Sequence, residues 1–197
     1  NEIGGAFCKV DVTNTDDIVN AVEMAKSMGP VRVLVNSAGI GWAQRTVGKD
    51  GQYESAANLD AFKKVIAINL VGSFDCIRIA ATAMSTSEPL EYGERGAIVN
   101  IASVAAFDGQ IGQASYSASK GGVVGMTLPI ARDLAAVGVR VNTVAPGLID
   151  TPIYGTGEGS EKFKAHLGKD VLFPKRLGDA SEIASMVCEL ITNPYMN

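Results

Sequence analysis

Four short runs of the chain are apolar on both faces, and this feature restricts the possible folds more than any other. The runs cover residues 5–12, 32–39, 96–103 and 139–147. Strands that are apolar on both faces belong to parallel sheets that helices cover on each side. Between the runs, the pattern predicts helices over residues 16–27, 58–84, 116–136 and 181–191. This alternation predicts an α/β fold, a doubly wound parallel sheet in three layers.

The size of the chain limits its organisation. The sequence has 197 residues, of which 47% are hydrophobic, enough for one core but too few for two comfortable domains. We therefore expect residues 1–197 to form a single domain. Residues 41–57 and 85–95 are polar and loop-like, and the longer glycine-bearing stretch at residues 148–170 interrupts the alternation.

Charge and hydropathy argue against two classes of partner. The net charge of −4 comes from charges spread along the chain, without the basic stripe that nucleic acid or an anionic membrane requires. The sequence also has no continuous run of about 18 apolar residues, and its first residues do not resemble a signal peptide. We expect no nucleic-acid partner, no membrane partner and a cytoplasmic location.

The cysteines do not suggest a disulfide framework or a metal site. Cys8, Cys76 and Cys188 are odd in number, far apart and without C-x-x-C spacing. They are expected to be buried free thiols in a reducing compartment. No cluster of His, Cys, Asp and Glu has the spacing of metal ligands, so no metal is expected.

Ligands of doubly wound sheets bind beyond the carboxyl ends of the strands. This rule selects Asp11 and Val12, the N-S-A-G run at residues 36–39, Ser103, and Pro146 with Gly147. The small side chains in N-S-A-G could let the backbone approach a flat ligand, or could simply form a tight turn. The pattern alone favours neither interpretation.

Tyr116 and Lys120 form the most distinctive pair in the sequence. Four residues apart on a predicted helix, they lie on one face, about one turn from each other. A lysine ammonium and a second positive charge can lower the pKa of a tyrosine, ordinarily about 10, into a catalytic range. An oxidised nicotinamide would supply that second charge. The spacing alone is weak evidence, because such pairs also arise by chance.

Two further polar residues strengthen this interpretation. Ser103, at the end of the preceding strand, could donate a hydrogen bond to a substrate carbonyl oxygen while Tyr116 transfers the proton. Asn69 stands among apolar neighbours in A-I-N-L-V-G-S-F. Its alternatives are a solvent-facing or a capping asparagine.

These residues resemble the short-chain dehydrogenase/reductase family, whose fold is Rossmann-like. The resemblance rests on D-V at residues 11–12, N-S-A-G at 36–39, Asn69, Ser103, Y-S-A-S-K at 116–120 and R-V-N-T-V-A-P-G-L-I-D-T at 140–151. Residues 102–135 and F-P-K-R-L-G-D at 173–179 look more narrowly like a 3-hydroxyacyl-CoA dehydrogenase group within that family. The motifs occur in the family's order over nearly the whole sequence.

The resemblance implies roles for the residues that match. Tyr116 would be the general acid/base, Lys120 would bind the nicotinamide ribose and lower the tyrosine pKa, Ser103 would hold the substrate oxygen, and Asn69 would anchor a water in the proton relay. The cofactor would contact Asp11, Val12, Asn36, Ala38, Gly39, Tyr116, Lys120, Pro146, Gly147, Ile149 and Thr151. The substrate would contact Ser103, Tyr116 and, as a weaker candidate, Gln110.

The resemblance also implies a reaction and partners. We expect NAD(H)-dependent interconversion of a secondary alcohol and a ketone, with 3-hydroxyacyl-CoA and 3-oxoacyl-CoA as the first choice. NADP is not excluded. Residues 148–172 would be the family's variable substrate loop, whose Ile149, Tyr154, Phe163 and Leu167 suit an apolar acyl chain or a steroid equally. The small residues around Tyr116 and Lys120 would leave space for cofactor and for a helix interface in a homotetramer.

The sequence lacks three features of the family. The glycine-rich phosphate loop T-G-x-x-x-G-x-G does not occur, and neither does the acidic residue of the second strand that selects NAD or NADP. The family's last strand is missing too. We therefore expect the sequence to be part of a longer chain.

Rival interpretations are weaker. Ser117 and Lys120 spell the S-x-x-K motif of penicillin-binding enzymes, but the companion motifs S-D-N and K-T-G do not occur. His166, the single histidine, lies in the variable loop, where a surface or pocket-lining role is expected rather than catalysis. The remaining alternative is a non-catalytic protein of the same fold that binds a dinucleotide or a partner.

Overall fold

A computed structural model describes residues 4–155 and 157–197. Three parallel strands, β1 (Val33–Asn36), β2 (Gly96–Ile101) and β3 (Val139–Val144), form a sheet in that order. Asn36 pairs with Asn100, which pairs with Thr143, so the carboxyl ends of the strands lie together at one edge. The parallel sheet predicted from the apolar runs is confirmed.

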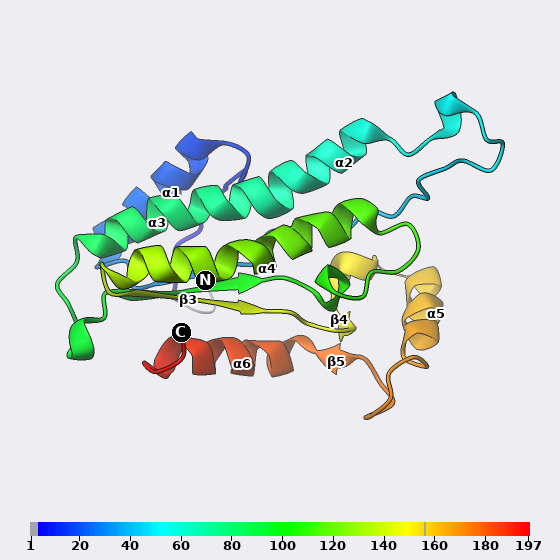
Figure 1. Ribbon diagram of the computed structural model, residues 1–197. Coiled ribbons are helices and arrows are strands. Elements are labelled where there is room, and N and C mark those ends of the chain that lie inside the picture. Colours follow the sequence, from blue (N-terminus) through cyan, green and yellow to red (C-terminus); the bar gives the residue numbers. More distant parts are fainter. Residues whose placement is uncertain (1–3, 156) are drawn as a thin grey trace.

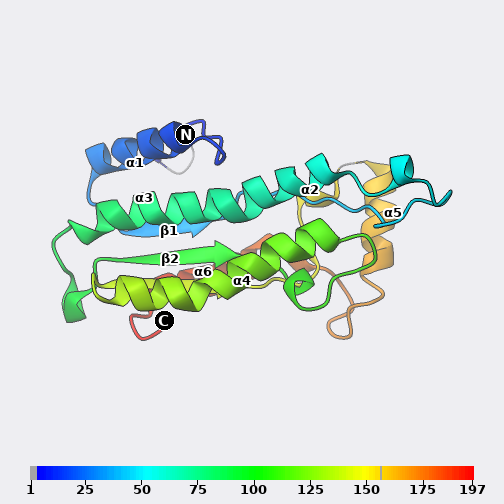
Figure 2. The same cartoon turned by 45° about the horizontal axis from the view of Figure 1, so that its top comes forward.

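Helices cover the sheet on both faces, as Figure 1 shows. The helices α3 (Ser73–Ser85) and α4 (Ala114–Ala135) bury Ile77, Met84 and Ile130 against Ile98 on one face. The helix α6 (Ala180–Thr192) packs Val187 and Leu190 against Val99 on the other. The three predicted layers are therefore present. The helix α1 (Thr15–Met28) lies beside α3 in both ribbon views (Figures 1 and 2).

The long helix predicted over residues 58–84 contains a local change in winding. It consists of α2 (Leu59–Ile66), a π-helical segment η2 (Ala67–Gly72) and α3. By length and composition alone, the helical stretch from Tyr53 to Ser85 could cross a membrane. Its inner side chains, among them Ile77 and Met84, instead fill the core between α3 and the sheet, and a core helix passes the same test of composition.

Three expectations need correction. Residues 5–12 form no strand, because they have no hydrogen-bonded partner strand in the described part of the chain, and Phe7 is exposed there. Residues 148–170 contain more than loop: a short strand β4 (Ile149–Asp150), which pairs with β5 (Gly178–Asp179), and the helix α5 (Glu158–Leu167). The three cysteines are free thiols, but Cys188 is exposed and the other two are only partly buried.

Helix α4 approaches η2 closely, which fixes the position of the site. A Cβ added at Gly122 would lie 2.6 Å from Leu70 Cδ2. The glycine therefore permits this helix contact, as the packing argument from the sequence expected. The sequence also predicts that the small residues leave room for a helix interface in an assembly. Gly125 is the position available for such an interface, because it is exposed and has open space beside it.

Candidate active site

Ser103 stands at the carboxyl edge of the sheet. The main-chain nitrogens on either side of it bond to β3 and the residues beyond: Ala102 N to Val144 O at 2.7 Å and Val104 N to Pro146 O at 2.9 Å. The Ser103 hydroxyl oxygen accepts a hydrogen bond of 3.1 Å from Ala105 N and so caps the short 3₁₀ helix Val104–Ala106. With one lone pair used, its O–H remains able to donate.

Helix α4 places Tyr116 and Lys120 on one face, as their spacing predicts. The Lys120 Nζ lies 5.8 Å from the centre of the Tyr116 ring and donates to Ile101 O at 2.7 Å. Ile101 ends β2, so the ammonium is fixed at the same sheet edge as Ser103. Lys120 is 6% exposed, and burial lowers its pKa.

The pKa of Tyr116 is raised, because burial disfavours the charged tyrosinate more than a polar contact with Ser103 favours it. This contact brings the predicted hydroxyl pair together. The direction differs from the lowering that was expected from Lys120. The physical reason is that burial of the tyrosine outweighs the stabilisation of its charged form.

Asn69 lies in the π-helical segment η2 and is fully buried, so neither the solvent-facing nor the simple capping alternative applies. Its amide bonds both main-chain groups of Ile40: Oδ1 accepts from Ile40 N, and Nδ2 donates to Ile40 O, each at 2.9 Å. The second Nδ2 hydrogen is directed to Ser119 Oγ at 3.1 Å. The side chain therefore anchors the loop after β1 to the two central helices. Single-turn π segments inside α-helices are frequent at functional sites.

The loop after β1 offers an open backbone surface. Ser37, Ala38 and Gly39 are all exposed at the carboxyl end of this strand. A Cβ added at Gly39 would lie 3.3 Å from Asn69 Oδ1 and 3.6 Å from Lys120 Nζ, so glycine suits this close approach. Beyond β3, Gly147 is exposed and has free space beside it.

Three other predicted cofactor residues are engaged within the protein. The buried Asn36 side chain donates to Asn100 Oδ1 at 2.9 Å and contacts Ser73 O at 3.3 Å. The exposed Asp11 carboxylate accepts from the main-chain N–H and hydroxyl of Thr13, and these hydrogen bonds lower its pKa. Val12 packs against the Gly72 position of η2.

Two predicted cofactor residues lie in the variable loop. Ile149 lies in β4, and Thr151 is the residue before the turn that carries Tyr154. The pKa of Tyr154 is raised, first by burial and then by the charges of Tyr116 and Asp150.

The aromatic ring of Tyr154 stands edge-on to Phe163 of α5, with centroids 6.0 Å apart. Gln110 is exposed in the turn before α4, where its main chain bonds to Gln113. His166 is exposed on α5. Within residues 4–155 and 157–197, no group of three or more His, Cys, Asp or Glu could hold a metal ion.

Sequence reasoning missed how the site is held together. Ser119 was expected only to leave space, yet it is fully buried and bonded to Asn69 and to Tyr116 O. The carbonyl of Ile101 and the main chain of Ile40 were missed because backbone partners leave no mark on residue identity. The only signal in the sequence was the position of Ser119, between Tyr116 and Lys120 on the same predicted helix.

A Ser–Tyr–Lys set at the carboxyl edge of a doubly wound sheet is the arrangement of an oxidoreductase that acts on CH–OH groups. The model of the short chain dehydrogenase family matches residues 2–160, and the chain belongs to that family.

The chain is 50% identical to human 3-hydroxyacyl-CoA dehydrogenase type-2 over 193 residues, which are 97% of this chain and 72% of that protein. The crystal structure of 3-hydroxyacyl-CoA dehydrogenase type-2 from Mycobacterium avium superposes with a TM-score of 0.90 at 41% identity, over 100% of this chain and 75% of that one. The structure of ElxO with NADP bound gives a TM-score of 0.78 at 26% identity, over 96% and 73% of the two chains.

Proposed function

We propose that the protein interconverts 3-hydroxyacyl-CoA and 3-oxoacyl-CoA with a nicotinamide dinucleotide as the hydride carrier. The observation that carries this proposal is the meeting of Ser103, Tyr116 and Lys120 at one sheet edge. Half of the aligned residues are identical to those of a relative named for that substrate. The non-catalytic alternative is not favoured, because the whole catalytic set is intact and converges in space.

The residues present suit a flat dinucleotide. Gly39 and Gly147, at the ends of β1 and β3, leave the backbone open where a side chain would intrude. When bound there, an oxidised nicotinamide would supply the acceptor for the hydride of the carbinol carbon. We propose NAD as the cofactor. Its contacts would be Asp11, Val12, Asn36, Ala38, Gly39, Tyr116, Lys120, Pro146, Gly147, Ile149 and Thr151, with main-chain atoms serving for Asn36.

The protein's own residues orient the substrate and move the proton. The O–H of Ser103 donates to the substrate oxygen, and Tyr116 takes the carbinol proton during oxidation or returns it during reduction. The Lys120 ammonium supplies a fixed positive charge beside Tyr116 and a donor for a ribose hydroxyl. Because the Asn69 side chain is fully engaged, a relay water would bind its main-chain carbonyl, which also accepts from Ser73 Oγ at 2.8 Å.

Several wider features belong to the same proposal. Residues 1–197 act as one catalytic domain, residues 148–172 select the substrate, and the active protein is a cytoplasmic homotetramer. The open face of α4 at Gly125 supports a helix interface in the assembly.

The test is steady-state oxidation of NADH with acetoacetyl-CoA by the wild type, Tyr116→Phe and a control variant. Removing the Tyr116 hydroxyl should lower kcat by about 10²–10⁴-fold, the usual contribution of positioned proton transfer. Tyr92→Phe is the matched control, because Tyr92 is 83% exposed in the loop before β2 and should retain full activity. Turnover that survives Tyr116→Phe would contradict the mechanism, and an inactive wild type would favour the non-catalytic alternative.

A further inference from the structure

Ser119 occupies a junction between three parts of the site. It is fully buried on α4, three residues after Tyr116 and immediately before Lys120. Its hydroxyl donates to Tyr116 O at 2.7 Å and accepts from Asn69 Nδ2 at 3.1 Å. The single hydroxyl oxygen serves both bonds, since a hydroxyl can donate on one side and accept on the other.

The hydrogen bonds form a chain with a fixed direction. Asn69 donates to Ser119, and Ser119 donates to the main chain of Tyr116. Asn69 Nδ2 donates its other hydrogen to Ile40 O, and Asn69 Oδ1 accepts from Ile40 N. These two hydrogen bonds fix the orientation of the amide. The loop after β1, the π-helical segment η2 and helix α4 are thus linked through two buried side chains.

The same junction lies against the Lys120 ammonium. The Gly39 position faces both Asn69 Oδ1 and Lys120 Nζ, at 3.3 and 3.6 Å from an added Cβ. Figures 1 and 2 both show α4 running alongside the α2–α3 helix, whose contact with α4 includes η2. A shift of α4 against η2 would therefore move Tyr116 and Lys120 relative to the loop that carries Gly39.

We propose that Ser119 is a positioning residue that couples the Asn69 amide to helix α4. This coupling keeps Tyr116 and Lys120 in a fixed position relative to the loop at Ile40. The proposal rests on the oxidoreductase function proposed above. Ser119 acts through other residues, because its hydroxyl is buried and bonded to protein on both sides. It contacts neither the exposed cofactor surface nor the Ser103 hydroxyl.

Ser119→Ala tests the proposal, because it removes one oxygen and places the best helix former in the helix. Misplacement of the reacting groups should lower kcat about 10- to 100-fold. The KM for acetoacetyl-CoA should stay within about twofold of the wild-type value, since the substitution removes no contact that binds the substrate equally in the ground state and the transition state. Thr127→Val is the control. Thr127 is also on α4 and loses a comparable pair of hydroxyl contacts, to Val123 O and Thr143, away from Tyr116 and Lys120.

Amide hydrogen exchange gives a second measurement that does not depend on turnover. Ser119→Ala should loosen the hold of Asn69 on Ile40 and accelerate exchange of the Ile40 amide, which Thr127→Val should leave unchanged. In the Asn69→Ala background, Ser119→Ala should have little additional effect on either quantity.

A merely structural role predicts another pattern. Both hydroxyl deletions would then lower the melting temperature while leaving kcat unchanged, and this result would overturn the proposal. If the wild type fails to turn over acetoacetyl-CoA, the proposed function fails separately, and exchange at Ile40 still decides the coupling. Unchanged exchange in Ser119→Ala would then refute it.

Discussion

At the scale of single residues, burial acts on Tyr116 and Lys120 in opposite directions. It raises the pKa of the tyrosine and lowers that of the lysine, so both neutral forms are favoured. Tyr116 therefore holds its proton at neutral pH and, in the proposed reaction, would donate it in the reduction of a ketone. Oxidation of an alcohol needs the tyrosinate, which the protein alone disfavours.

The pKa shifts predict opposite pH dependences for the two reaction directions. Reduction should keep a constant kcat/KM through neutral pH and decline as the pH rises through the raised pKa of Tyr116. Oxidation should increase with pH as Tyr116 loses its proton, and loss of the Lys120 charge, favoured by its lowered pKa, should limit that increase. Profiles of kcat/KM in both directions check this. A reduction rate that increases with pH would contradict the assignment of Tyr116 as the acid.

Single residues also show how far the sequence predicts the site. Tyr116, Lys120 and Ser103 could be named from residue type and order, and the structure brings them together. The partners of Asn69 could not be named, because the main chain of Ile40 has no residue signature and Ser119 is one of several serines nearby. The protonation of Tyr116 was also beyond sequence reasoning, since burial decides it.

At the scale of elements, two adjacent glycines on α4 have different surroundings. A Cβ at Gly122 would lie 2.6 and 2.9 Å from the two Leu70 methyl carbons, whereas one at Gly121 would meet only Ala106 O at 3.8 Å. Gly122→Ala should therefore reduce the free energy of unfolding by about 1–3 kcal/mol through overpacking. Gly121→Ala should raise it by up to about 1 kcal/mol, the helix preference for alanine.

Urea unfolding of both variants measures the difference. Equal effects of Gly121→Ala and Gly122→Ala would show that α4 does not approach η2 as closely as the structure has it.

The start of α6 depends on a charged capping arrangement. Asp179 and Glu182 form a capping box, in which Asp179 N donates to Glu182 Oε2 at 2.7 Å. Arg176 binds both Glu182 oxygens at 2.8 Å, and this bidentate pair lowers the pKa of Glu182 to about 2. A lowered pKa means that the carboxylate stabilises the fold above its ordinary pKa of 4.5 and ceases to do so as the pH falls to about 2.

Glu182→Gln should therefore lower the melting temperature at neutral pH. The difference in melting temperature from the wild type should shrink as the pH falls from 4.5 to about 2. Thermal unfolding at several pH values checks this expectation. A difference that does not change with pH would mean that the carboxylate charge has no part in it.

The elements also divide into those that local pattern predicts and those that it does not. Strands β1 to β3 were predicted, because apolar runs on both faces mark a covered parallel sheet. Residues 5–12 carry a similar pattern but form no strand, since strand structure needs a partner that local sequence does not supply. Helix α5 was missed because the glycines at positions 155, 157 and 159 near its start masked its periodicity.

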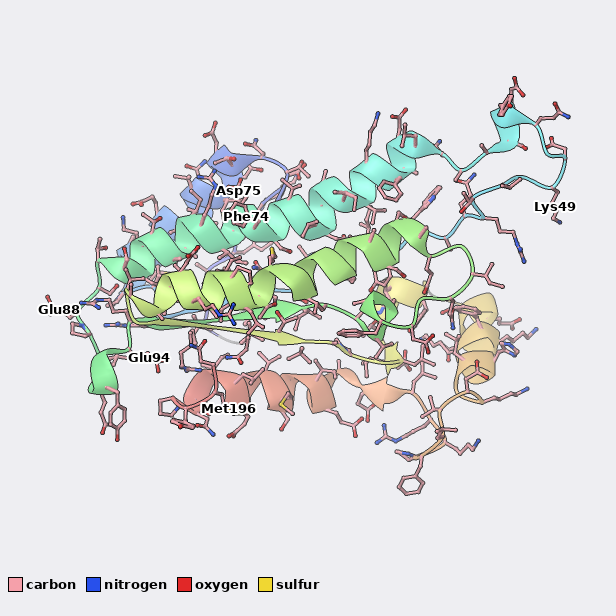
Figure 3. All side chains as sticks on the ribbon, in the orientation of Figure 1. Lys49, Phe74, Asp75, Glu88, Glu94 and Met196 are labelled. Carbon is pink, nitrogen blue, oxygen red and sulfur yellow. The ribbon has the colours of Figure 1, made fainter. Side chains whose placement is uncertain are left out.

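At the scale of the whole molecule, Arg140 connects β3 to Glu94, to the last turn of α6 and to Met196. The buried guanidinium binds Glu94 at 3.0 and 3.2 Å and the carbonyls of Leu190, Ile191 and Met196 at 2.7–2.8 Å. Figure 3 shows Glu94 and Met196 at the same end of the molecule. One side chain thus holds the last turn of α6 and the main chain at Met196 against the sheet.

Arg140→Met should destabilise the protein by about 3 kcal/mol, because it leaves buried acceptors without their partner. Limited proteolysis should then cut first within residues 193–197. Arg132→Met, at an exposed position near the end of α4, is the matched control and should change neither quantity. Equal protease resistance of Arg140→Met and wild type would contradict this role.

The central claim is that this domain transfers hydride between a nicotinamide and the carbon that bears the substrate oxygen. The most direct test supplies the protein with acetoacetyl-CoA and NADH that carries deuterium on the transferred position of its ring, and analyses the product by mass spectrometry. The account predicts one deuterium on the carbinol carbon of 3-hydroxybutyryl-CoA, formed by the wild type and not by Tyr116→Phe. Product without deuterium, or no product from the wild type, would contradict the account.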